Sequence, residues 1–95
     1  MDEHQKAVQL GDEIKKIASN PSFQQAITQM VDRQMQIIKS SQVEESSKRE
    51  SAFFLLRAIQ ELQNEFNVLV NRRDRAQLEI EKNSKTETKT RAARK

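Results

Sequence analysis

The sequence predicts an all-α protein: an elongated helical hairpin or a slender three-helix bundle, with one long C-terminal helix and a disordered basic tail. The 95 residues include one Gly and one Pro, so turns are few and the helices must be long. No run alternates as a half-buried strand would. Most important, nine positions are separated by alternating steps of three and four residues, the seam of a helix packed lengthwise on other helices. These positions are Ala52, Leu55, Ile59, Leu62, Phe66, Leu69, Arg73, Ala76 and Ile80.

Residues 2–18 form the first predicted helix. Its apolar positions step by three and four residues from Ala7 to Ile17, and acidic side chains stand at its start, where the helix dipole favours negative charge. Gly11 falls within this helix. A glycine there costs about 1 kcal/mol relative to alanine, so it marks either a close helix crossing or a weak point. From the sequence we favour the weak point.

A turn is predicted at Asn20 and Pro21. The residue before a proline avoids the helical region, asparagine is a favoured N-cap and proline a favoured first helical residue. A second helix over 21–39 should therefore begin with Asn20 as its cap. One continuous helix kinked at Pro21 is the alternative.

The polar, serine-rich segment 40–47 is the predicted chain reversal. Either Ser46 or Ser47 could cap the next helix, and Ser47 with Glu50 matches the capping-box pattern. The third helix should cover residues 48–82 and carry the seam. Residues 1–82 are then one helical domain, in which the first two helices fold back along the third.

Residues 83–95 have no apolar periodicity and are predicted to be a disordered basic tail. Five cations against Glu87 give this segment a charge of 5 − 1 = +4. The tail could bind the phosphate groups of a nucleic acid, or it could bind an acidic protein surface. The candidate residues are Lys85, Lys89, Arg91, Arg94 and Lys95.

Catalytic and ligand-binding chemistry is not expected. There is no cysteine and a single histidine, His4, near the chain start, so no catalytic, cofactor-binding or metal-binding residue is predicted and the protein is not expected to be an enzyme. No apolar run approaches the ~20 residues needed to span a bilayer. We therefore expect no membrane contact and a cytoplasmic location.

Four residues are candidates for contact with a protein partner. Phe53 lies one step off the seam, on an otherwise polar side, as a docking side chain would. Arg72, Arg73 and Arg75 are the densest basic cluster outside the tail. They form either a solvated helix face with local ion pairs or a partner site, in which Arg73 would fix register or meet an acidic residue of an oligomer. From Arg73 to Ile80 the seam loses bulk, so the oligomer contact is expected in that half.

The order of these elements resembles small helical proteins encoded by tailed bacteriophages, whose pattern is a short helix, an Asn-Pro-x-Phe turn, a helix, a polar turn and a long amphipathic helix. The resemblance covers residues 7–80 and is carried by residues 18–27 (ASNPSFQQAI), 49–50 (RE) and 55–62 (LLRAIQEL). It implies a role in virion assembly or packaging, in the host cytoplasm or the virion, and no catalytic residue.

The functional prediction is a non-enzymatic helical assembly or adaptor protein, a homo-oligomer or the partner of another helical protein. The first alternative is a nucleic-acid-binding packaging or regulatory subunit that uses the basic tail. The second is a small secretion- or assembly-type chaperone.

Overall fold

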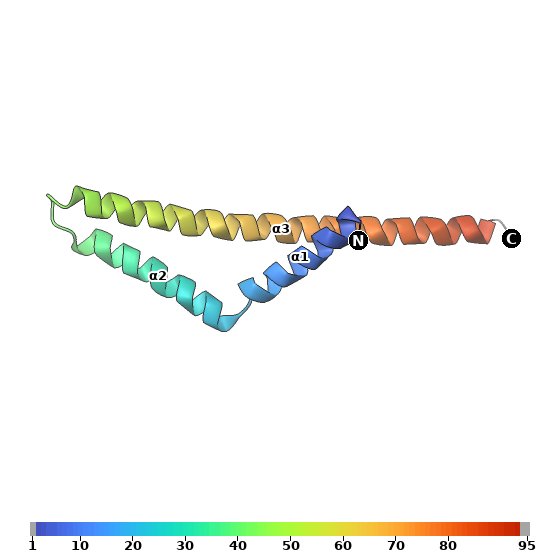
Figure 1. Cartoon of the computed structure of the whole chain (residues 1–95), viewed down its shortest axis with the longest axis horizontal. Coiled ribbons are helices and arrows are strands. Elements are labelled where there is room, and N and C mark those ends of the chain that lie inside the picture. Colours follow the sequence, from blue (N-terminus) through green and yellow to red (C-terminus); the bar gives the residue numbers. More distant parts are fainter. Residues whose placement is uncertain (1, 94–95) are drawn as a thin grey trace. The chain divides into compact units, whose positions relative to one another are not determined.

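A computed structural model of the chain confirms the all-α class and the long C-terminal helix (Figure 1). The structure describes the backbone of residues 2–93 and the side chains of residues 2–85. Within them it contains α1 (Glu3–Ala18), α2 (Pro21–Ser40) and α3 (Ser46–Ala93), and no strand. Among the described residues the chain forms two compact units: unit 1 joins residues 2–16 with 67–93, and unit 2 is residues 17–66.

Unit 2 is an antiparallel hairpin of α2 and the first part of α3. Figure 1 shows α2 folding back along α3 from the loop at residues 41–45. At the far end of the hairpin the rings of Phe23 and Phe66 lie 5.9 Å apart between centroids, within the range of favourable aromatic pairs. The predicted reversal of the chain is therefore confirmed.

The predicted boundary between the first two helices is also confirmed. α1 ends at Ala18, and α2 begins at Pro21. The side-chain oxygen of Asn20 accepts a hydrogen bond of 3.0 Å from the backbone N–H of Phe23, so it satisfies one of the donors that a helix start leaves free. Asn20 itself is extended, with φ −68° and ψ 122°, so the helices are separate and not one kinked helix.

We expect Asn20→Ala to destabilise unit 2 by about 1 kcal/mol, because the Phe23 N–H loses its acceptor and alanine is a poor N-cap. Urea unfolding followed by far-UV circular dichroism measures this loss. Ser22→Ala, at an exposed neighbouring position, is the matched control and should change stability by less than about 0.5 kcal/mol. Equal effects of the two substitutions would contradict the capping role.

The start of α3 differs from the prediction. Ser46 and Ser47 are both inside the helix, so neither is the cap and the predicted capping box is wrong. The carbonyl of Glu45 accepts from the N–H groups of Lys48 and Arg49 at 3.2 and 3.3 Å, which makes Glu45 the residue before the first turn. Its carboxylate is used elsewhere, as acceptor of the Gln42 N–H at 2.8 Å. The serine pattern alone could not show that the helix begins at Ser46.

Unit 1 consists of α1 against the later part of α3. α1 starts with a reciprocal cap: the Asp2 carboxylate accepts from the Gln5 N–H at 2.8 Å, and the Gln5 side-chain oxygen accepts from the Asp2 N–H at 3.2 Å. Glu3 and Ala7 lie beside Ala76 and Glu79, whereas Gly11 lies on Arg73. Because later residues of α1 meet earlier residues of α3, the two helices are antiparallel.

The end of α3 also differs from the prediction. The helix continues past Lys82 to Ala93, so residues 83–93 of the expected disordered tail belong to a helix, and residues 94–95 lie outside the described part. Extending an existing helix needs no new nucleation, and each added residue gains one backbone hydrogen bond. A polar sequence can therefore remain helical when it follows a long packed helix.

Candidate interaction surfaces

The seam of α3 consists of two lines of positions, each with a spacing of seven residues. The first line is Ala52, Ile59, Phe66, Arg73 and Ile80, and the second is Leu55, Leu62, Leu69 and Ala76. In unit 2 the first line is buried more deeply than the second. Ala52 and Ile59 are buried, the latter with 7% exposed, whereas Leu55 and Leu62 remain 47% and 43% exposed.

The exposed part of the second line belongs to a wider apolar stripe, which we call the flank stripe. It consists of Phe54, Leu55, Ala58 and Leu62. All four are exposed, and steps of three and four residues place them on one side of the helix. The free apolar surface of α3 is therefore contiguous.

Phe53 lies outside the flank stripe, one step of about 100° around the helix from Phe54. Both rings are more than half exposed. The described residues thus give Phe53 no buried site within the chain, and its role in a partner contact stays a prediction.

The seam from Leu69 onwards is partly covered within unit 1, and the expected oligomer contact between Arg73 and Ile80 stays a prediction. Ala76 is buried, and Leu69, Arg73 and Ile80 are half-buried. In unit 1 α1 packs on this part of α3. The loss of bulk along the seam indicates a partner helix within the chain, and the exposed seam residues lie in the first half of α3.

Gly11 marks the close crossing of α1 and α3. A Cβ atom at this position would lie 2.1 Å from the Cβ and 2.6 Å from the Cγ of Arg73, and 3.1 Å from the carbonyl oxygen of Leu69. Such distances exclude every residue other than glycine unless the helices move apart. Our preference for a weak point at Gly11 was wrong, because the glycine is required by the approach of the two backbones.

Arg73 has its acidic partner within the chain. Its Nε donates to the Asp12 carboxylate at 2.8 Å and its Nη1 to Asp74 at 3.2 Å. The hydrogen bond to Asp12, and then that to Asp74, raise the pKa of the guanidinium above its ordinary value. The one charged position of the seam thus fixes how α1 lies on α3, and no oligomer is needed to explain it.

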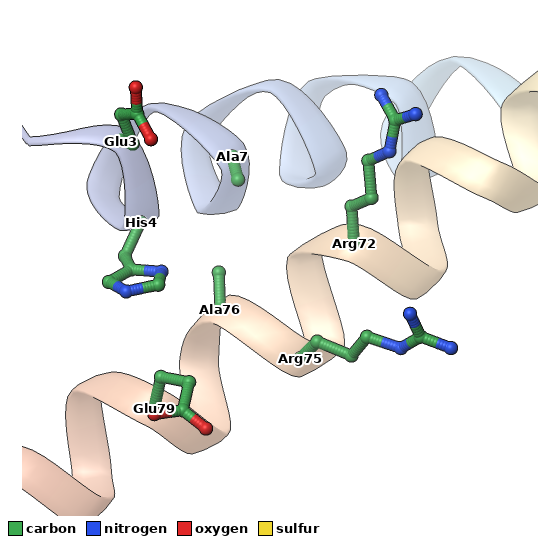
Figure 2. A pocket seen from close by; sticks show the side chains of 7 residues that line it. All are labelled: Glu3, His4, Ala7, Arg72, Arg75, Ala76 and Glu79. Carbon is green, nitrogen blue, oxygen red and sulfur yellow. The ribbon is translucent and has the colours of Figure 1, made fainter.

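Next to this crossing lies an open hollow between the start of α1 and α3 (Figure 2). It has a volume of about 270 Å³. Ala7 and Ala76 face one another across its middle, Arg72 and Arg75 lie toward one end, and His4 and Glu79 toward the other. Neither Arg72 nor Arg75 forms an ion pair with any described residue. Of the local ion pairs expected for this arginine cluster, the described residues show only that between Arg73 and Asp74.

Arg49 is hydrogen-bonded to the loop at residues 41–45. The guanidinium of Arg49 donates to the Ser41 hydroxyl at 3.1 Å, to the Gln42 carbonyl and to the Val43 carbonyl at 3.1 Å. The Gln42 N–H, which donates to the Glu45 carboxylate, lowers the pKa of that carboxyl, and Lys48 lowers it further. These contacts leave the Val43 side chain 89% exposed, beside the exposed Glu44.

Most of the predicted nucleic-acid contacts lie outside the described side chains. Lys85 is exposed on α3. The other four residues of that prediction, Lys89, Arg91, Arg94 and Lys95, are beyond residue 85, so the structure gives no contact for them.

Two further findings concern ligands and membranes. Among the described residues, no three His, Cys, Asp or Glu side chains gather as a metal site would require. Within the same part of the chain, no helix combines the length and the apolar character needed to cross a bilayer.

Sequence reasoning missed the Asp12 pair, the hollow and the exposed loop tip. For the loop a signal existed, since Val43 is the only apolar residue in the polar segment 40–47.

The chain matches no protein-family model, and no curated protein or solved structure is detectably similar to it.

Proposed function

We propose that this protein is a non-enzymatic helical assembly or adaptor protein, and that it associates with a second copy of itself through the flank stripe. The proposed setting, a tailed-phage particle or its host cytoplasm, is supported by the resemblance of residues 7–80 to small helical phage proteins.

One observation carries the proposal: the described part of the chain leaves its best apolar surface uncovered. No large side chain in it is fully buried, and the buried hydrophobic residues are only Ala52, Ile59 and Ala76. Meanwhile Leu55 and Leu62, both on the seam, remain about half exposed beside Phe54. Small chains with little buried apolar surface commonly complete their core by association.

A second copy is the partner that the stripe matches best. If two α3 helices pack antiparallel with the two-fold axis between residues 58 and 59, Leu55 of each copy lies opposite Leu62 of the other. The small side chain of Ala58 at the centre permits close approach of the helices. In the same register Arg57 lies opposite Gln60 of the second copy and one residue, about 1.5 Å along the axis, from its Glu61, so these oppositely charged side chains attract. A patch that matches itself under a two-fold axis is what an isologous dimer requires.

We expect the double substitution Leu55→Ser/Leu62→Ser to raise the dissociation constant of this dimer about a thousandfold. Four half-buried leucines per dimer, at about 1 kcal/mol each, sum to about 4 kcal/mol, which is three powers of ten. Sedimentation velocity over a concentration series measures the effect. The wild-type chain should sediment with twice the chain mass at micromolar concentration, and the variant as a monomer.

Leu78→Ser is the matched control. Leu78 is a highly exposed leucine on the same helix but off the seam, so its loss removes apolar surface without touching the flank stripe. This variant should associate like the wild type. A wild-type chain that stays monomeric at every concentration, or a Leu78 variant as defective as the double variant, would contradict the proposal.

A further inference from the structure

The loop tip of unit 2 has the properties of a docking element. Val43 is the most exposed of the large apolar side chains among the described residues, at 89%. Arg49 holds the backbone on both sides of it through the carbonyls of Gln42 and Val43. A side chain kept exposed on a fixed loop loses little conformational entropy on binding.

The tip is also acidic. Glu44 follows Val43 directly, is exposed, and forms no ion pair with any described residue. Glu45, by contrast, is occupied by the Gln42 N–H and by Lys48 at 3.5 Å. The tip therefore presents one aliphatic side chain with one free carboxylate next to it.

The hollow of unit 1 has the complementary properties. Ala7 and Ala76 give it an apolar middle, and Arg72 and Arg75 line one end without an acidic partner among the described residues (Figure 2). A valine side chain between the alanines would bring a neighbouring carboxylate within reach of these guanidinium groups. The arginine guanidinium group can bind a carboxylate through two parallel hydrogen bonds, in a bidentate geometry.

We propose that the Val43–Glu44 tip of one copy docks into the hollow of another copy, so that the protein assembles head to tail. Val43 fills the space between Ala7 and Ala76, and Glu44 pairs with Arg72 and Arg75. The carboxylates of Glu3 and Glu79, toward the other end of the hollow, repel a tip that enters in the reverse orientation. The charges of the hollow thus select one direction.

This contact joins two different surfaces, so each copy keeps a free tip or a free hollow for the next one. This inference rests on the proposed function, because the head-to-tail contact would link copies of the protein, or dimers formed through the flank stripe, into a larger assembly. A contact of one side chain and one carboxylate is small, and small interfaces are weak and transient. It must be measured at the concentrations used in nuclear magnetic resonance.

The test uses two full-length variants, each defective in one half of the contact. The tip variant is Val43→Ser/Glu44→Ser, and the hollow variant is Arg72→Glu/Arg75→Glu. Both also carry Leu55→Ser/Leu62→Ser, which removes the dimer and separates this inference from the proposed function. Each variant alone should bind itself at least about tenfold more weakly than the parent. Mixing them leaves one intact tip and one intact hollow.

We expect the 15N-labelled hollow variant to show chemical-shift changes at residues 41–45 when unlabelled tip variant is added. With the labels reversed, the changes should fall on the start of α1 and on residues 72–79. Adding unlabelled hollow variant to the labelled hollow variant is the matched control and should produce none.

No shift changes in the productive mixture, or changes of the same size in the control, would overturn the proposal while leaving the dimer of the flank stripe untouched. Shifts at residues 72–79 on adding a duplex oligonucleotide, with none on adding an intact tip, would assign the hollow to nucleic acid instead and equally overturn it.

Discussion

Replacing Gly11 with alanine should release α1 from α3, although alanine is the better helix former. In an exposed helix the change would stabilise by about 1 kcal/mol. Here the new Cβ would lie 2.1 Å from the Cβ of Arg73. That atom is bonded directly to the backbone, so no rotamer change removes the overlap and the helices must separate. Overpacking of this kind costs about 1–3 kcal/mol, and the separation also stretches the 2.8 Å bond between Arg73 and Asp12.

The measurement is hydrogen exchange of the α1 amides. A net loss of about 1.4 kcal/mol would lower their protection about tenfold, whereas unit 2 should be unaffected. Gln9→Ala, at an exposed position of the same helix, is the control and should leave protection unchanged or slightly raised. Slower exchange in the Gly11 variant would show that the glycine is a weak point after all.

A second substitution separates the steric effect from other causes. Arg73→Gly removes the Cβ that Gly11 faces, so Gly11→Ala/Arg73→Gly moves the small residue from α1 to α3. We expect the double variant to be more protected in α1 than the sum of the two single effects predicts, since the overlap is gone. The coupling of contacting residues is 0.5–3 kcal/mol in such cycles. Strictly additive effects would mean that Arg73 does not exclude a side chain at Gly11.

The local features of the fold were predictable because their determinants are adjacent in sequence. Asn20 caps a helix whose first donors lie two and three residues away, and Pro21 stops the preceding helix by its own ring. The reversal at residues 40–47 likewise needs only a short polar segment. Each of these predictions depends on interactions within a few residues.

Features that depend on a distant residue could not be assigned. A single glycine in a helix is expected to lower helix stability unless another backbone is known to pack against it. The residue that packs against Gly11, Arg73, is far from it in sequence. Arg73 looked like an oligomer contact for the same reason, since Asp12 is one of fourteen acidic residues that could have been its partner. The start of α3 was assigned wrongly for a different, local reason: Ser47 and Glu50 match a capping pattern, but the residue before the first turn is Glu45, whose carboxylate accepts from the Gln42 N–H.

The seam of α3 combines a feature that the sequence predicts with one that depends on distant residues. Its period predicted correctly that α3 packs lengthwise, and it could not show which of its two lines another helix covers. A heptad pattern describes the helix that carries it, and its partners are chosen by the neighbours. In unit 2 the line of Ala52 and Ile59 is buried, whereas Leu55 and Leu62 are about half exposed.

The difference in burial between the two lines of the seam gives the last prediction, which compares Ile59→Ala with Leu62→Ala. Ile59 is 7% exposed and Leu62 is 43% exposed within one chain. We expect Ile59→Ala to cost about 2–5 kcal/mol, because it leaves a cavity under α2. In dilute solution Leu62→Ala should cost only about 1 kcal/mol, since much of its surface is already in water.

Protein concentration separates the two roles. Association stabilises only the folded chain, so the stability of an associating protein rises with concentration. The deficit of Ile59→Ala relative to the wild type should be nearly constant over a hundredfold range, while that of Leu62→Ala should widen as dimers form. Thermal unfolding at both ends of the range measures this. A deficit of Leu62→Ala that does not change with concentration would place Leu62 outside any interface, and the flank stripe would then be an exposed surface without a second copy on it.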